Sequence, residues 1–293
     1  MGDALAQGTH TTTVYGIEQR FHVAGHGPVC VVHPGGPGLN WDYLRMPELE
    51  QHLRLVYVEP IGTGGSGRLA DPHGYHVSTY VNVLDAVVST LSADQVFLLG
   101  HGHGGLVAQR YGLDHPDRVA GLVLYATSPV TGEQFQQSLL AGLAAFPTRH
   151  PRRREQAAAA VRAFEQALTA TDDEGFSRGV RAAWPAAVAD YWAHEHRYAP
   201  VRAGTRGWVV PWRARRSAPF DVQRELGRLD TPTLVLAGAH DPFFGPRWAA
   251  LLHEAVRDSG LLVFAESGNL PHLEQPAAFT GAVADFVHLV GTQ

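Results

Sequence analysis

The stretch that decides the fold reads Val96-Phe97-Leu98-Leu99-Gly100-His101-Gly102-His103-Gly104-Gly105-Leu106-Val107. Its first four residues form an apolar run typical of a buried strand, and a helical pattern begins at Leu106. The four glycines of residues 100–105 indicate a sharp turn in which backbone segments approach closely. The stretch therefore predicts a buried strand that turns abruptly into a helix.

Apolar runs of the same kind recur along the chain and alternate with helical patterns. They cover residues 29–32, 55–58, 122–125 and 234–237, and a helical pattern covers residues 80–91. Two shorter strands, paired antiparallel, are expected at residues 11–17 and 20–24. Strands separated by helices form doubly wound sheets, so the expected fold class is α/β with a mostly parallel sheet.

The alternation stops from Pro129 to about Leu229, in an interval rich in alanine, arginine and helix-length stretches. Its position between two strands predicts a helical cap over residues 129–229, inserted between core parts 1–128 and 230–293. Loops at the carboxyl ends of parallel strands bind ligands. Four aromatic residues of the cap are candidates for binding a substrate, and the alternative is that they pack in its core: Trp184, Tyr191, Trp192 and Trp208.

Composition excludes several classes of function. The net charge of −5 gives no reason to expect a nucleic-acid partner. All 23 basic residues are arginines, which excludes a Schiff-base lysine and a P-loop lysine. The single cysteine, Cys30, lies in an apolar run and forms no internal disulfide. No histidine spacing gathers metal ligands on one face, so neither a metal nor another cofactor is expected.

The first residues lack the basic start and apolar centre of a signal peptide, and no later run of ~18 apolar residues indicates a membrane span. We therefore expect a cytoplasmic protein without a membrane partner, whose partner is a small-molecule substrate. The sequence leaves the oligomeric state open.

Five motifs recur here in the order known from one superfamily. They are the Pro34–Gly38 loop followed by Trp41–Leu44, the Gly62–Ser66 turn, the Gly100–Gly105 turn, Gly238–Asp241, and Gly268–Glu274. With them the chain resembles the α/β-hydrolases over nearly its whole length, and within them the branch similar to proline iminopeptidases. The Gly100–Gly105 turn resembles the nucleophile elbow G-x-S-x-G of these enzymes, with Gly102 at the serine position.

The resemblance implies a triad in the chain order nucleophile, acid, histidine. It places the acid at Asp241 and the histidine at position 269, where this chain has Asn269. The alternative for the histidine is His272. With Gly102 and Asn269, two triad members are missing, and Asn269 retains an amide that can donate a hydrogen bond to Asp241.

The oxyanion hole of the family needs no side chain at Gly102. The resemblance assigns it to the backbone N–H groups of His103 and Gly36, with Gly35, Gly102 and Asn269 beside the substrate. Chemistry through an enolate also needs a base, for which His103 ranks first and His272 second. The remaining candidates are His101 and His33, which more readily serve as buried structural histidines, then Glu59 and a group of the substrate itself.

Three functions remain open. The first is a non-hydrolytic enzyme, of the cyclase, isomerase, epimerase or lyase type, acting on a small apolar or aromatic carbonyl compound. The arginine bias is compatible with a GC-rich bacterial genome, and specialised metabolism is a natural setting. The second is a pseudo-hydrolase that binds a small molecule or a partner without turnover. The third is an ester or amide hydrolase whose catalytic residues were replaced.

Overall fold

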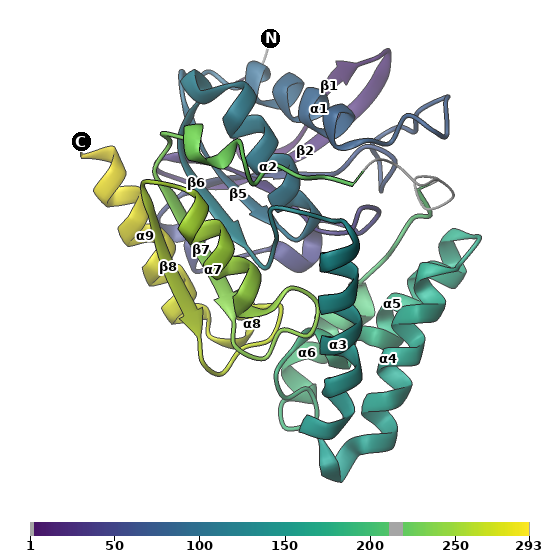
Figure 1. The fold of residues 1–293 in the computed structure, drawn as a ribbon. Helices are drawn as coiled ribbons and strands as arrows, with labels where there is room; N and C mark the ends of the chain where they lie inside the picture. The colour runs from purple at the N-terminus through teal and green to yellow at the C-terminus, as the bar shows by residue number, and fades with distance from the viewer. Residues whose placement is uncertain (1–2, 211–218, 293) are drawn as a thin grey trace.

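The computed structural model describes residues 3–210 and 219–292. Its centre is an eight-stranded sheet in the order β1-β2-β4-β3-β5-β6-β7-β8 (Figure 1). β1 and β2 form an antiparallel pair, β2 runs antiparallel to β4, and the remaining strands are parallel. The predicted α/β class with a mostly parallel sheet is confirmed. The strands are β1 Gly8–Val14, β2 Ile17–Gly25, β3 Val29–His33, β4 Arg54–Val58, β5 Val96–His101, β6 Val119–Tyr125, β7 Thr233–Gly238 and β8 Ser259–Phe264.

The first hairpin turns earlier than the sequence pattern predicts. The strands expected at residues 11–17 and 20–24 are in fact β1 and β2, and the turn lies at Tyr15 and Gly16. Both residues have positive φ, 56° and 73°. A two-residue turn with positive φ at both positions matches the right-handed twist of a hairpin, and this geometry places the turn at Tyr15 despite its side chain.

Helices cover both faces of the sheet. On one face α1, α2 and α7 share a core with the strands, and on the other α9 packs together with the short segments η1 and η2. Successive residues of the central strands alternate between these cores: Leu98 belongs to the first and Leu99 to the second. The helices are α1 Val77–Thr90, α2 His103–Asp114, α7 Gly245–Ala255, α8 Pro271–Glu274 and α9 Pro276–Gly291, with 3₁₀ segments η1 Asp42–Leu44, η2 Leu49–Gln51, η3 Pro116–Arg118 and η7 Leu226–Arg228.

A group of helices lies between β6 and β7 in the sequence, where the cap was predicted. It contains α3 Glu133–Arg149, η4 Pro151–Arg153, α4 Arg154–Leu168, α5 Asp173–Ala183, η5 Trp184–Ala187 and α6 Glu195–Gly204. Figure 1 shows these helices gathered to one side of the sheet, with α4 and α5 against each other. Within the described ranges, no helix combines the length and apolar character needed to cross a membrane.

Candidate functional site

The site is built around the turn from β5 into α2. β5 ends at His101, α2 begins at His103, and Gly102 between them has φ 53° and ψ −117°. Side chains disfavour this backbone conformation. The neighbouring glycine is required by packing, since a Cβ at Gly104 would stand 2.1 Å from the carbonyl oxygen of His33. The predicted strand, sharp turn and helix are therefore present.

Space remains beside Gly102 for a small side chain. A Cβ at this position would stand 3.5 Å from Cα of Gly35 and 3.7 Å from Cε2 of Phe244, which are ordinary contacts. Backbone conformation, not crowding, therefore favours glycine at position 102.

A cavity of about 310 Å³ opens beside this turn and extends under the cap. Six aromatic side chains give it a mostly apolar wall: Phe135, Phe164, Phe176, Trp184, Phe243 and Phe244. Six of the residues predicted for catalysis or substrate binding line it: Gly35, Gly36, Gly102, His103, Trp184 and Asn269. His101, one of the remaining candidates for the base, lines it as well. We refer to it as the elbow pocket.

Three predicted aromatic residues do not line the elbow pocket. The hydroxyl of Tyr191 donates to Glu195 and accepts from Arg202. Trp192 packs against Tyr191 and the cap residues around it. Trp208 lies where the chain returns to the core, and its backbone N–H donates to Gly38. For Tyr191 and Trp192 these contacts favour packing, the alternative left open by the sequence.

His272 is also outside the elbow pocket, and both of its ring nitrogens have partners. Nε2 lies 2.8 Å from the carbonyl oxygen of Tyr43, and Nδ1 lies 2.7 Å from the hydroxyl of Tyr125. A carbonyl only accepts, so Nε2 carries the hydrogen and Tyr125 donates to Nδ1. Burial lowers the pKa of His272 to about 4. This arrangement is that of a neutral structural histidine and weighs against a role as base.

A chain of hydrogen bonds links the glycine loop to Asp241. The N–H of Gly35 donates to the hydroxyl of Tyr43 (2.7 Å), which donates to Nδ1 of His101 (2.8 Å). Nε2 of His101 donates to Oδ1 of Asn269 (3.0 Å), and Nδ2 of Asn269 donates to Oδ2 of Asp241 (2.9 Å). The donor and acceptor of each hydrogen bond follow from the two ends of the series, because the backbone N–H of Gly35 only donates and the carboxylate of Asp241 only accepts. The expected bond from Asn269 to Asp241 is present.

Burial decides the charge of the residues in this series of hydrogen bonds. Burial lowers the pKa of His101 to about 3, so its ring is neutral at pH 7. Burial also raises the pKa of Asp241, against the effect of the Asn269 amide and of the N–H groups of Phe243 and Phe244. With donors on both carboxylate oxygens, Asp241 is satisfied without a histidine beside it. The sequence contained no local signal for Tyr43 or His101 in this role, since their partners are distant along the chain.

His103 is the one histidine of the elbow pocket without a partner for a ring nitrogen among the described residues. Its Nδ1 is buried and unpaired, and its ring meets Tyr80 edge to face at 4.8 Å between centroids. Burial, together with nearby His33, lowers the pKa of His103 to about 3. Its backbone N–H is the first of α2 and so has no acceptor within the helix. His103 therefore brings to the pocket wall a backbone N–H without an acceptor in the helix and a neutral imidazole whose Nδ1 is buried.

The remaining base candidates serve the structure. Glu59 accepts from the N–H of Gly65 (2.7 Å) and lies 3.3 Å from Nε2 of His22. Nδ1 of His33 donates to the carbonyl of Pro34 (3.1 Å). Neither Glu59 nor His33 lines the elbow pocket, and residues 3–210 and 219–292 contain no cluster of side chains suited to a metal ion.

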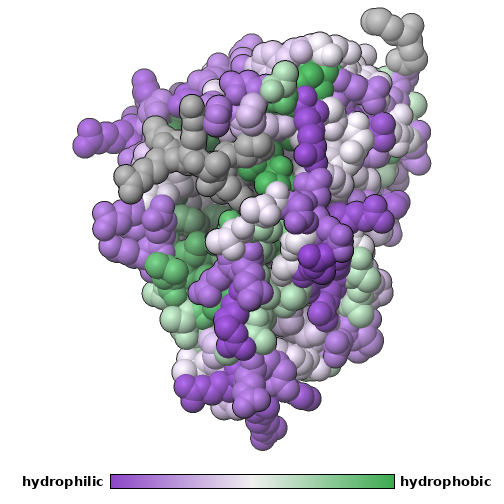
Figure 2. All heavy atoms as spheres, turned by 90° about the vertical axis from the view of Figure 1, so that its right-hand side faces the viewer, coloured by the Kyte–Doolittle hydropathy of each residue, from purple (hydrophilic) through white to green (hydrophobic). Residues whose placement is uncertain are grey.

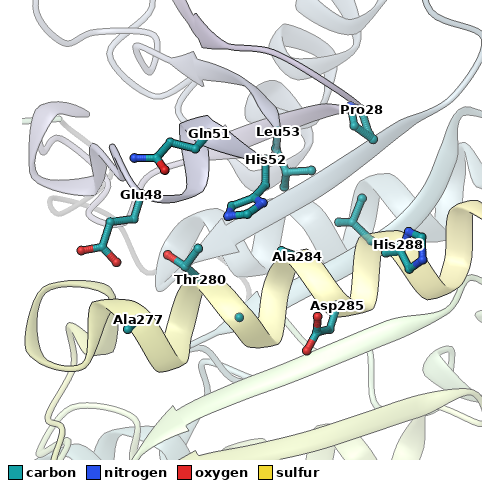
Figure 3. Close-up of a pocket in the computed structure, with 12 residues that line it drawn as sticks. Pro28, Glu48, Gln51, His52, Leu53, Ala277, Thr280, Ala284, Asp285 and His288 are labelled. Atoms are coloured by element: carbon teal, nitrogen blue, oxygen red, sulfur yellow. The ribbon is translucent and has the colours of Figure 1, made fainter.

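A second hollow of about 610 Å³ lies between η2 and α9. Figure 3 shows Glu48 and His52 on one wall and Thr280 and Asp285 on the α9 side. None of the residues predicted for the site lines it. We regard it as a surface groove between packed elements.

Comparisons with known proteins agree with this architecture. The 2-hydroxy-6-oxo-2,4-heptadienoate hydrolase of Pseudomonas putida is 28% identical over 284 residues, covering 93% of each chain. A proline iminopeptidase of Heyndrickxia coagulans is 23% identical over 283 residues, covering 93% of this chain and 94% of that enzyme. At this identity the iminopeptidase-like branch stays a prediction.

Solved structures and a family model give the same fold. An esterase from Rhodococcus sp. ECU1013 superposes with a TM-score of 0.74 at 21% identity, covering 95% of this chain and 97% of that one. The family model for the alpha/beta hydrolase fold matches residues 28–276. The chain therefore belongs to the α/β-hydrolase family.

Proposed function

We propose that this protein is a non-hydrolytic enzyme of the α/β-hydrolase family that binds a small, largely apolar or aromatic compound and polarises its carbonyl group. The observation that carries the proposal is the elbow pocket itself. Gly36, Gly102 and His103 meet there in an apolar wall, while the position between β5 and α2 has no side chain that could attack a substrate. Chemistry of the cyclase, isomerase, epimerase or lyase type fits such a site.

Hydrolysis through an acyl-enzyme is disfavoured by two residues. We infer that Gly102 and Asn269 occupy the places of the serine and the histidine of the family. Asn269 supports this inference because it hydrogen-bonds Asp241, as the histidine of a triad would. Members of a triad act as a unit, and loss of one lowers turnover by about six orders of magnitude.

The proposed chemistry uses two backbone N–H groups and the imidazole of His103. The N–H groups of Gly36 and His103 would donate to a carbonyl oxygen held between them, and the positive end of α2 adds to their field. A proton on the carbon next to the carbonyl would then pass to the imidazole of His103, leaving an enolate under the two donors. Burial lowers the pKa of His103 to about 3. An adjacent enolate would raise it, because opposite charges favour each other.

Proton exchange tests this proposal without knowledge of the natural substrate. We expect the protein to catalyse incorporation of deuterium from D₂O next to the carbonyl of 4-phenylbutan-2-one, followed by proton NMR. His103→Ala keeps the backbone donor and removes the base, so the rate should fall by about 10². His103→Pro also removes the N–H at a helix position that favours proline, and should lower the rate by a further factor of about 10².

The pair of variants also shows what would contradict the proposal. Equal rates for His103→Ala and His103→Pro would mean that the backbone N–H is not used. Unchanged exchange in both variants would remove His103 from the mechanism.

A second candidate is a protein that binds the same class of ligand without turnover. The low pKa of His103 favours it, because a weakly basic imidazole is a poor proton acceptor in the absence of a nearby anion. This candidate predicts saturable binding of the ketone and no deuterium incorporation above the uncatalysed rate.

A further inference from the structure

The last strand of the sheet, β8, has an open edge of apolar residues. The strand order places β8 at one end of the sheet, where β7 is its partner among the described strands (Figure 1). Leu261, Leu262 and Val263 follow one another in this strand and are 36%, 38% and 38% exposed. An exposed apolar strand at a sheet edge pairs readily with another strand. The edge of β8 is therefore a candidate interaction surface.

The sequence of β8 does not block such pairing. Residues 259–264 include no proline and no charged residue, and their register with β7 shows no bulge. Proline, charge and bulges are the means by which edge strands avoid pairing. The other edge strand, β1, consists mostly of threonines and a histidine. Figure 2 shows the side of the molecule turned away from β8, where hydrophilic side chains predominate. Of the two edges of the sheet, that of β8 is the apolar one.

Hydrogen bonds to β7 show which backbone groups of β8 face outward. The carbonyls of Asp258 and Phe264 accept from N–H groups at the start of β7 and just after its end, both at 2.9 Å. Successive residues of a strand alternate in direction, and the register between these two bonds is continuous. Ser259, Leu261 and Val263 therefore direct their N–H and C=O groups to the outer edge.

We propose that the outer edge of β8 pairs with β8 of a second copy of this chain, antiparallel about a two-fold axis at Leu261. A two-fold axis brings identical surfaces together, and hydrogen-bonded antiparallel pairs need outward backbone groups on both strands. An axis at Leu261 meets both conditions, because Leu261 lies opposite the partner's Leu261 and Ser259 lies opposite the partner's Val263. One sheet then continues through both copies.

Side chains favour this register on both faces of the sheet. Ser259 Oγ contacts α7 through Nδ1 of His253 (2.8 Å), so Leu261 also lies on the α7 side and meets the partner's Leu261 there. On the other face, Leu262 lies opposite the partner's Gly260. A Cβ at Gly260 would have one neighbour within 4 Å, Cδ1 of Leu234 at 3.7 Å, so this position leaves room for a leucine. The strand is therefore complementary to itself.

Charges at the ends of β8 favour an axis at Leu261 over one at Leu262. Arg257, Asp258 and Glu266 are exposed, and none of them has an ion-pair partner among the described residues. The axis at Leu261 brings Arg257 to the end of the ladder where the partner has Glu266. An axis at Leu262 places Asp258 directly opposite the partner's Glu266, and like charges in that position destabilise a strand pair.

Disulfide crosslinking tests the pairing at single residues. Two cysteines at position 261 would have Cα atoms about 5.5 Å apart, a separation that a disulfide spans. We expect Leu261→Cys to form a covalent dimer on mild oxidation, seen by non-reducing electrophoresis. Leu262→Cys is the matched control with similar exposure, because its two copies would lie about 7–8 Å apart on the diagonal and should stay uncrosslinked. The native Cys30 is buried.

The mass in solution tests the interface without a new cysteine. Size-exclusion chromatography with light scattering should give twice the chain mass of 31.7 kDa for the wild type. Leu261→Lys places two ammonium groups opposite each other at the axis and should raise the dissociation constant of the dimer at least about 10-fold. Leu140→Lys is the control, on the exposed surface of α3 in the cap, and should leave the dimer unchanged.

The same measurements can overturn the proposal. A wild-type protein with the mass of one chain at every concentration would show that β8 does not pair with a second copy. Equal crosslinking of Leu261→Cys and Leu262→Cys would exclude the axis at Leu261. A dimer as tight in Leu261→Lys as in the wild type would place the interface elsewhere. Each readout is independent of catalysis, so a failure here leaves the proposed function untouched.

Discussion

Gly102 relieves backbone strain at the turn, and the space that a side chain would fill is nevertheless present. Its φ of 53° belongs to a region where a residue with a side chain is strained by about 1–3 kcal/mol, and glycine avoids most of that cost. The side-chain space nevertheless remains, bounded at 3.5 Å by Gly35. The residue therefore stabilises the turn while leaving the pocket in the shape that a nucleophile would need.

If Gly102 and Asn269 hold the places of the triad serine and histidine, as we propose, a serine and a histidine at these positions should give hydrolysis. The double variant Gly102→Ser, Asn269→His is expected to hydrolyse 4-nitrophenyl acetate, because Asp241 and the backbone donors are in place. Each single variant should stay inert, since triad members act together. Gly102→Ala is the control for strain, and both substitutions at position 102 should lower the stability by about 1–3 kcal/mol in urea unfolding. A folded double variant that binds 4-phenylbutan-2-one but releases no nitrophenolate would show that these positions are not those of the triad.

The sequence predicted the pocket residues that stand in short motifs. It did not predict contacts between residues that only the fold brings together. Gly36, Gly102, His103 and Asn269 stand in short motifs with fixed spacing, and all four line the pocket. Tyr43 was visible only as part of a loop motif. Its contact with His101, 58 positions along the chain, depends on tertiary structure and has no signature in either segment.

At the scale of elements, the junction of β5 and α2 is held by close backbone packing. Gly104→Ala would place a Cβ 2.1 Å from the carbonyl oxygen of His33, so we expect a loss of stability of more than about 2 kcal/mol. Gly281→Ala on α9 is the matched control, because no atom outside its own helix lies within 4 Å. There the substitution should stabilise by about 0.5–1 kcal/mol through helix propensity. Thermal unfolding followed by circular dichroism measures both, and a neutral Gly104→Ala would contradict the proposed packing.

The buried strands predicted from the sequence are those with a continuous run of apolar residues. Buried strands such as β5 and β6 appear as continuous apolar runs, because both of their faces are covered. The edge strand β8 was not predicted, and its residues Gly260–Val263 are exposed in the fold. Its pairing comes from β7 alone, and a pattern based on burial does not mark such a strand.

At the scale of the whole molecule, burial gives the site its electrostatic character. The sheet end, the glycine loop and the cap enclose histidines that an exposed surface would leave titratable near neutral pH. Packing keeps them uncharged. Because these buried histidines are neutral, the folded protein should lose stability when the pH falls.

Stability should therefore decrease steeply below pH 6.5. Burial lowers the pKa of His33 and His272 to about 4 and of His101 and His103 to about 3, against 6.5 for an ordinary histidine. As the pH falls from 6.5 toward 4, these histidines bind protons in the unfolded chain but stay neutral in the folded chain. The free energy of unfolding therefore decreases. Glu274 acts in the opposite sense, because burial raises its pKa to about 7 and the folded state binds its proton first.

Asp241, whose pKa burial also raises, acts in the same sense as Glu274, and the four histidines outweigh these two carboxyl groups. We expect a net loss on the order of 3 kcal/mol between pH 7.5 and 5.5, measured by urea unfolding at each pH. Glu274→Gln removes one opposing proton and should make the dependence steeper over this range. His272→Gln removes one of the four and should make it shallower. A free energy of unfolding that stays constant from pH 7.5 to 5.5 would mean that these histidines are not held neutral by the fold.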